Sequence, residues 1–300
     1  MKKIPVILDT DIGNDVDDVW ALVMLLKSPE VDIKLITTDS NNTIYRARLV
    51  AKLLDIAGRT DIPIGVGIPL EAGHENHADW LEGYQLSDYP GEVMNDGVGA
   101  IVDTIMHSAE PITLLCIGPV PNIAAALQRE PCIAEKCRFV GMYGSLRIGY
   151  DGRPDPVPEF NVYKAAHACQ MVFSAEWPMV ITPLDTCGLL TLTGENFQQV
   201  AQSKDPLVQA LIALHHTWKR NIDWPAYRDL DPNTASSILF DCVAVHLVYS
   251  EAFLNMEELG VRVTNDGRTI IDPDAKQIRC ATSWTDQAAF ERYLTERLVS

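Results

Sequence analysis

Five carboxylates stand within ten residues near the N-terminus, in the segment Asp9-Thr10-Asp11-Ile12-Gly13-Asn14-Asp15-Val16-Asp17-Asp18. Like charges this close repel one another, so a chain tolerates them on a solvated face or around a bound cation. The segment lies between a β-rich apolar run (residues 4–8) and an apolar stretch of helical length (residues 16–27). We therefore expect a cation or catalytic site at the end of a first strand, and oxygen donors favour Ca²⁺, Mg²⁺ or Mn²⁺ over zinc.

A structural explanation covers only part of this acidic segment. Asp17 and Asp18 could complement the dipole at a helix N-terminus, and Asp15 could be the N-cap. Asp9 and Asp11 at the end of the strand remain unexplained. An EF-hand loop is excluded, because Gly13 falls at position 5 of a loop starting at Asp9 and a strand precedes it.

Short apolar runs alternate with amphipathic segments along most of the chain. Strands are predicted at residues 4–8, 33–37, 62–65, 112–117, 137–142 and 180–182. Helices are predicted at residues 16–27, 44–57, 97–107, 122–128, 163–173, 207–219, 235–249 and 285–298. This alternation predicts an α/β fold, a single domain over residues 1–300, with an open, mostly parallel, Rossmann-like sheet and helices on both faces. The turn sequence at residues 265–267 adds a small C-terminal β-hairpin.

Composition excludes several classes of protein. The formal net charge is −17, from 24 Lys and Arg against 41 Asp and Glu, which disfavours a nucleic-acid partner or an anionic membrane. The seven cysteines are odd in number and form no CxxC pair, as in proteins with reduced thiols. The N-terminal apolar run is too short for a signal peptide or a membrane span. We expect a cytoplasmic protein.

Four further motifs follow the acidic segment in order. They are Ile36-Thr37-Thr38 with Asn42, the run Ile117-Gly118-Pro119-Val120-Pro121-Asn122-Ile123-Ala124, the run Glu159-Phe160-Asn161-Val162-Tyr163, and Asp241 at the start of an apolar helix. Together with Asp9-Thr10-Asp11-Ile12-Gly13 and Asp17-Asp18, they resemble the signature of the inosine-uridine-preferring nucleoside hydrolases. The commoner form of that signature has the Asp-Asp pair two residues nearer the glycine, so this chain is similar to a longer variant.

The resemblance implies calcium-dependent hydrolysis of the N-glycosidic bond of ribonucleosides, yielding ribose and free base. It implies a metal-bound water activated by Asp11 as the catalytic residue, and a homodimer or homotetramer. The implied Ca²⁺ ligands are Asp11, Asp18, Asp241 and the backbone carbonyl of Ile117. The implied ribose-binding residues are Asp17, Asn42, Glu159 and Asn161, with Asp9 supporting Asp11. From the residues alone, Asp241 is better explained as a helix N-cap, and Glu159 and Asn161 could equally cap the helix after them.

One position departs from the family pattern. Many members with pyrimidine or broad specificity carry a histidine before the late aspartate, thought to protonate the leaving base, and here that position is Phe240. The available replacements are His74, His77 and Tyr143, while Trp80 or Trp224 could stack on a purine. Purine or pyrimidine preference stays open. Two alternatives also stay open: a Mg²⁺-dependent phosphatase of the haloacid dehalogenase type, with Asp9 as nucleophile, and a non-catalytic ribose or nucleoside binder.

Overall fold

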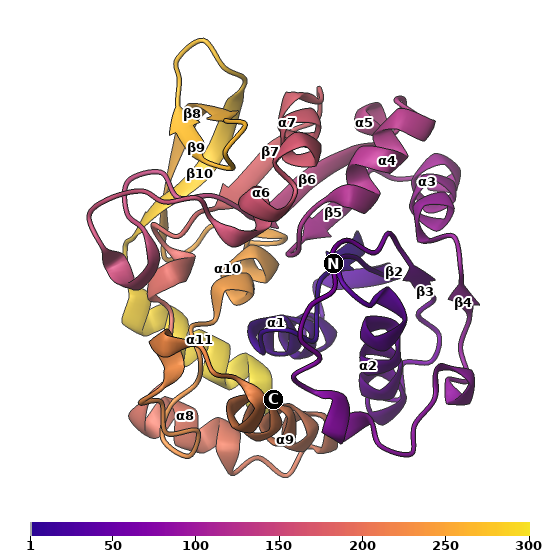
Figure 1. Ribbon diagram of the computed structural model, residues 1–300, viewed down its shortest axis with the longest axis vertical. Coiled ribbons are helices and arrows are strands. Elements are labelled where there is room, and N and C mark those ends of the chain that lie inside the picture. The colour runs from indigo at the N-terminus through magenta and orange to yellow at the C-terminus, as the bar shows by residue number, and fades with distance from the viewer. Residues whose placement is uncertain (1) are drawn as a thin grey trace.

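A single ten-stranded sheet runs through residues 2–300, the part of the chain that the computed structural model describes (Figure 1). Its strand order is β4-β3-β2-β1-β5-β6-β7-β10-β8-β9. The strands are β1 (Ile4–Thr10), β2 (Val31–Thr38), β3 (Ile64–Val66), β4 (Val93–Met94), β5 (Ile112–Cys116), β6 (Cys137–Met142), β7 (Met179–Thr182), β8 (Leu254–Val263), β9 (Thr269–Ile271) and β10 (Gln277–Trp284). From β4 to β10 all neighbours are parallel, which confirms the predicted open, mostly parallel sheet.

Helices cover both faces of the sheet, as predicted. The α-helices are α1 (Asp17–Leu26), α2 (Thr43–Ile56), α3 (Gly97–His107), α4 (Pro121–Arg129), α5 (Ile133–Lys136), α6 (Phe160–Lys164), α7 (Ala166–Ser174), α8 (Gly194–Ala201), α9 (Pro206–Asn221), α10 (Phe240–Leu247) and α11 (Gln287–Val299). Short 3₁₀ helices are η1 (Ala78–Leu81), η2 (Leu86–Asp88), η3 (Tyr150–Gly152), η4 (Cys187–Leu189) and η5 (Pro225–Tyr227). Helices α3, α4, α5 and α7 gather on one side of the sheet and α1, α2 and α8–α11 on the other (Figure 1).

The first strand shows why its sequence is a continuous apolar run. Val6 and Leu8 pack into the core beneath α1 and α2, whereas Ile7 between them packs into the opposite core, and all three are fully buried. A strand with helices on both faces has no solvent side, so it lacks the polar alternation of a half-exposed strand.

The C-terminal hairpin is confirmed and extends the main sheet. Strands β8 and β9 are antiparallel with Val263 opposite Thr269, and β8 also pairs antiparallel with β10. Strand β10 in turn lies parallel to β7. The turn signal therefore marks the far edge of the sheet, away from the N-terminal strands.

Two predicted helices are wrong in their extent. The predicted helix at residues 163–173 is two helices, because the backbone at Ala165 leaves the helical region between α6 and α7. The predicted helix at residues 235–249 begins only at Phe240. Residues 235–239 are extended because Ser236 and Leu239 donate backbone hydrogen bonds to the carbonyls of Leu192 and Leu190.

The strand order changes direction next to β1. From β1 the chain builds β2, β3 and β4 outward on one side, and then returns to place β5, β6 and β7 on the other. Ligands of open α/β sheets bind in the crevice outside the carboxyl ends of the strands at such a switch point. The loops after β1, β2 and β5 meet there. No helix within residues 2–300 has both the length and the apolarity to cross a membrane.

Candidate active site

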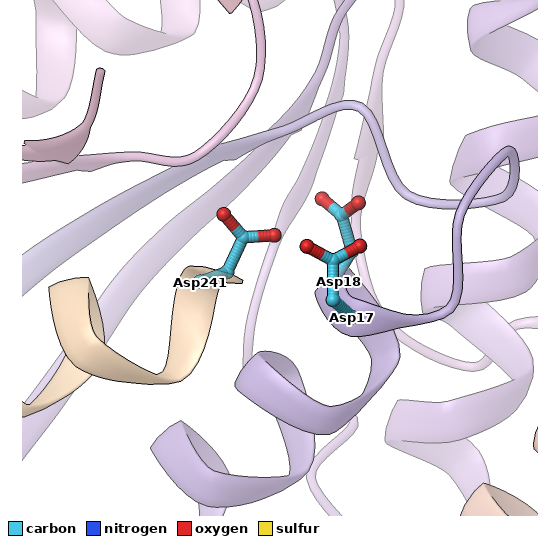
Figure 2. Close-up of side chains that lie close together, drawn as sticks. All are labelled: Asp17, Asp18 and Asp241. Atoms are coloured by element: carbon cyan, nitrogen blue, oxygen red, sulfur yellow. The ribbon is translucent and has the colours of Figure 1, made fainter. Parts of the chain in front are cut away.

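Three carboxylates meet where two helices begin. Asp17 and Asp18 lie in the first turn of α1, and Asp241 lies in the first turn of α10 (Figure 2). One oxygen from each lies within 4.8 Å of the others, and all three side chains are buried. Asp241 does not cap its helix, since the N-cap residue is Leu239 and no side chain caps α10. Residues more than 200 positions apart in sequence thus form one cluster.

Burial and mutual repulsion make this cluster costly without a cation. Burial raises the pKa of Asp17, Asp18 and Asp241 well above the usual range, and the neighbouring carboxylates raise it further. The positive ends of two helix dipoles offset part of this cost. All the donors are hard oxygen atoms, so the set fits Ca²⁺, Mg²⁺ or Mn²⁺ and does not resemble a zinc site.

Asp11 lies beside this cluster at the end of β1 and faces Arg46. Arg46 from α2 is buried, and its Nη2 lies 3.8 Å from Asp11 Oδ2. Burial raises the pKa of Asp11, while the Arg46 charge opposes that rise. Gly118 permits the close approach of the loop after β5, because a Cβ there would lie 2.7 Å from the Asp11 nitrogen. The glycine of the Gly-Pro motif therefore has a steric role beside Asp11.

The loop that joins Asp11 to α1 is held carbonyl by carbonyl. Backbone oxygens of residues 12–14 face side chains from α2 and from the segment before η1. Arg46 Nη1 donates to the Ile12 carbonyl at 2.7 Å. The Tyr45 hydroxyl donates to the Gly13 carbonyl at 3.0 Å, and Asn76 Nδ2 donates to the Asn14 carbonyl at 2.8 Å. His77 Nδ1 also contacts the Gly13 carbonyl at 3.1 Å. These bonds fix the loop between Asp11 and α1.

The cluster forms the floor of a cavity of about 380 Å³, a size typical of small-molecule sites, which we call the acidic pocket. Its described lining includes Asp11, Asp17, Asp18 and Asp241 on the floor, and Asp15, Asp151 and Glu159 around it. Of the predicted site residues, Ile117 and Asn161 line it as well. All the predicted site residues except Asn42 thus lie around one cavity.

Glu159 and Asn161 hold their positions through several hydrogen bonds. Glu159 is the N-cap of α6 and accepts from the backbone nitrogens of Asn161, Val162 and Gly144, at 2.7, 3.3 and 3.0 Å. Burial nevertheless raises its pKa to about 7. Asn161 Nδ2 donates to the carbonyls of Ile117 and Met142, both at 3.1 Å, which leaves its Oδ1 free for a ligand. Both residues therefore cap or brace the backbone and also face the acidic pocket.

Aromatic side chains form the other side of the acidic pocket. We call Tyr150, Trp224, Tyr227 and Phe240 the aromatic wall. The Tyr150 and Phe240 rings meet edge to face with centroids 6.0 Å apart, and Trp224 and Tyr227 are 6.2 Å apart. Sequence reasoning anticipated Trp224 as a residue that could stack on the base, and it singled out Phe240 as the position of the missing histidine. Tyr150 and Tyr227 sit in irregular connections that carry no periodic signal.

Asn14 and Asp15 in the longer loop also line the acidic pocket and were not predicted as site residues. The buried Asn14 Oδ1 has no hydrogen-bond partner. Burial raises the pKa of Asp15 to about 7, and one of its oxygens accepts from the Val16 nitrogen. The sequence signal that could have indicated both residues is their position between Asp11 and the Asp17-Asp18 pair.

Asn42 and Asp9 lie outside this lining. Asn42 is the N-cap of α2, where its Oδ1 accepts from the Tyr45 nitrogen and its Nδ2 donates to Glu75. Its neighbour Asn41 lines a second cavity of about 420 Å³ that shares Asp11 with the acidic pocket. Asp9 is 1% exposed, and its Oδ1 accepts from Thr37 at 2.5 Å and from Asn122 at 2.8 Å.

The candidate replacements for the missing histidine lie elsewhere. His77 is fully buried against the loop after β1, and the Tyr143 hydroxyl donates to the carbonyl of Gly118. Neither these two nor His74 belongs to the described lining of the acidic pocket. The Lys52 ammonium lies over the Trp80 ring, 4.2 Å from the ring centroid, and Trp80 does not line the acidic pocket either.

The fold is an α/β fold with a mostly parallel sheet, and at its switch point buried carboxylates form a cluster that could hold a hard cation. Comparison with known proteins gives the family. Residues 6–292 match the family described as inosine-uridine preferring nucleoside hydrolase. The chain belongs to this nucleoside hydrolase family.

Individual relatives and structures agree with that assignment. The chain is 29% identical over 288 residues to the pyrimidine-specific ribonucleoside hydrolase RihA of Escherichia fergusonii, covering 90% of this chain and 88% of that protein. It is 35% identical over 193 residues to an uncharacterized protein of Schizosaccharomyces pombe, and that match spans about 60% of each chain. A plant nucleoside hydrolase structure superposes with a TM-score of 0.82 at 22% identity over both full chains. The purine-preferring ribonucleoside hydrolase of Gardnerella vaginalis gives 0.76 at 21% identity, covering 98% of each chain.

Proposed function

We propose that this protein hydrolyses the N-glycosidic bond of ribonucleosides to ribose and free base, with Ca²⁺ as its metal. The observation that carries the proposal is the meeting of Asp17, Asp18 and Asp241 on the floor of a cavity with an aromatic wall. The floor suits a cation and sugar hydroxyls, and the wall suits a planar base.

The ion would be held by Asp11, Asp18, Asp241 and the Ile117 carbonyl, all of which line the acidic pocket. When bound, such an ion supplies a Lewis acid that makes water a stronger acid. Asp11 would take the proton from the attacking water as its oxygen bonds to C1′ of the ribose. Arg46 favours the ionised form of Asp11 that this role requires.

The ribose hydroxyls would be held by Asp17, Glu159 and Asn161. Fixed hydrogen bonds to the sugar strengthen as positive charge develops on it and reject sugars that lack a hydroxyl. Asn42 would join them only by giving up its contact with Glu75. The variants Asn42→Ala and Asn41→Ala test which of the two neighbours binds ribose, because truncation of only that residue should raise the KM.

Release of reducing sugar from inosine, uridine, adenosine and cytidine tests the activity. Asp11→Ala should abolish release, and Asp274→Ala, at an exposed position far from the pocket in the β9–β10 turn, is the matched control. Retained turnover in Asp11→Ala would remove Asp11 from the mechanism. Tight nucleoside binding without turnover in the unaltered protein would instead identify a non-catalytic binder.

Asp17 needs a separate measurement, because it belongs to the same oxygen cluster as Asp18 and Asp241. If Asp17 binds ribose, Asp17→Asn raises the KM and leaves Ca²⁺ affinity, measured by calorimetry, unchanged. If Ca²⁺ affinity falls, Asp17 is a metal ligand. The phosphatase alternative has less support, since the nucleophile it requires, Asp9, is buried and engaged by Thr37 and Asn122.

A further inference from the structure

The acidic pocket has an unusual balance of charge. Among the described residues that line it, seven carry carboxyl groups, five are aromatic, and none is a lysine, arginine or histidine. A single divalent cation carries two positive charges, fewer than the number of carboxyl groups around the cavity. A ligand that enters next to such an ion meets acidic groups and no basic side chain, which favours a positively charged ligand.

The aromatic wall favours the same kind of ligand. Planar cations bind over the faces of tryptophan and tyrosine rings, because those faces carry partial negative charge. Trp224 and Tyr227 lie side by side with an interplanar angle of 31°, and Tyr150 stands edge-on to Phe240. The carboxyl group of Asp15 lines the same cavity.

The described lining also holds no histidine to protonate the leaving group. A neutral nucleoside releases its base as an anion, so a proton must reach the base as the C1′–N bond breaks. Phe240 has no proton to donate, and Glu159 is occupied as an acceptor of three backbone N–H groups. Burial raises the pKa of Tyr150 and Tyr227, which makes both phenols weaker acids than free tyrosine.

We propose that the preferred substrates are ribosides whose leaving group carries a fixed positive charge, such as N-ribosylpyridinium compounds and N7-alkylated purine ribosides. This inference rests on the proposed hydrolase function and specifies its substrate class. The water oxygen bonds to C1′ while the C1′–N bond breaks. The electron pair of the C1′–N bond stays on the ring nitrogen and neutralises its positive charge. The base leaves as a neutral molecule, and the proton of water passes through Asp11 to solvent. No acid is needed on the base.

The test compares 7-methylinosine with inosine, and N-ribosylnicotinamide with uridine. General acids contribute about 10²–10⁴-fold to such reactions, so we expect kcat/KM for the cationic riboside to exceed that for its neutral partner by about that ratio. Because cationic ribosides are also more labile in water, Phe240→His is the internal control. It should raise kcat/KM for inosine by a larger factor than kcat/KM for 7-methylinosine, narrowing the ratio at least about tenfold. Equal rates in the unaltered protein, or a ratio that this variant does not change, would overturn the proposal.

Asp15→Asn gives a second, independent result. If Asp15 attracts the cation, the variant raises the KM for 7-methylinosine by a larger factor than the KM for inosine. If inosine hydrolysis falls and 7-methylinosine does not, Asp15 is a leaving-group acid and the proposal is wrong.

Two measurements test the substrate class separately from the proposed hydrolase function: calorimetric binding and the hydrolysis of an activated substrate. In Asp11→Asn, calorimetry should show 7-methylinosine binding at least about tenfold tighter than inosine. p-Nitrophenyl riboside is neutral and needs no proton on its leaving group. If neither it nor any nucleoside is hydrolysed, the hydrolase function fails. If it is hydrolysed while 7-methylinosine shows no advantage in rate or binding, only the substrate class fails.

Discussion

Replacing Arg46 with methionine should destabilise the protein far more than replacing a neighbouring arginine. The buried Arg46 guanidinium donates to the carbonyls of Ile12 and Ser40, at 2.7 and 3.0 Å, and lies 3.8 Å from Asp11. Arg46→Met leaves two buried carbonyls without a donor and one buried carboxylate without its counter-ion. Breaking a buried charge pair by removing one partner costs about 3–5 kcal/mol.

Arg48 is the matched control, because it lies in the same helix and is only half-buried. Its guanidinium donates to the carbonyl of Tyr84 at 2.7 Å, so Arg48→Met should cost about 1 kcal/mol. Arg46→Lys keeps the charge but loses the forked geometry and should fall between the two methionine variants.

Thermal unfolding followed by circular dichroism measures these differences. A loss of 1 kcal/mol shifts the Tm by roughly 2–4 °C in domains of 150–250 residues, so Arg46→Met should melt on the order of 10 °C below the unaltered protein. If Arg46→Met and Arg48→Met melt within about 2 °C of each other, Arg46 does not stabilise the acidic loop and the argument fails.

Three further results are expected. Ca²⁺ at a hundred times its Kd should stabilise the protein by about 2.7 kcal/mol; Asp241→Ala should abolish the Ca²⁺-dependent rise in Tm, whereas Asp274→Ala should keep it. Burial lowers the pKa of His215 to about 4, so the unfolded chain takes up the proton first. The contribution of His215 to stability is therefore complete above pH 6.5 and falls by up to about 3 kcal/mol toward pH 4, a loss that His215→Phe should remove from the pH dependence measured by urea unfolding. Gly13 has a φ of +115°, and a Cβ there would lie 2.7 Å from the Tyr45 ring. Gly13→Ala should cost about 1–3 kcal/mol and lower kcat, and an unchanged Tm would contradict the strain.

The sheet and its helices could be predicted because their signals are local. The continuous apolar run of β1 and the periodic pattern of α2 each depend on burial of the segment itself. The start of α10 could not be predicted in this way. Residues 235–239 pair with the segment before α8 instead of joining the helix, and that contact lies outside any short window of sequence.

The candidate site shows the same division. Asp11, Asp17 and Asp18 were found because their repulsion is visible within one segment. Asp241 was expected to join them only from the family resemblance, since an aspartate near a helix start is ordinarily a cap. Tyr150 and Tyr227 were missed because the connections that carry them have no period, and only the folded chain places them beside Phe240.

The position of Asp241 in the chain has a consequence for biosynthesis. Ribosomes add this residue more than 200 residues after Asp17 and Asp18. The N-terminal strands and α1 emerge long before, carrying Asp17 and Asp18 without their third partner. A cation held by all three carboxylates would therefore be bound only after Asp241 has been made, and it would join an early segment of the chain to a late one.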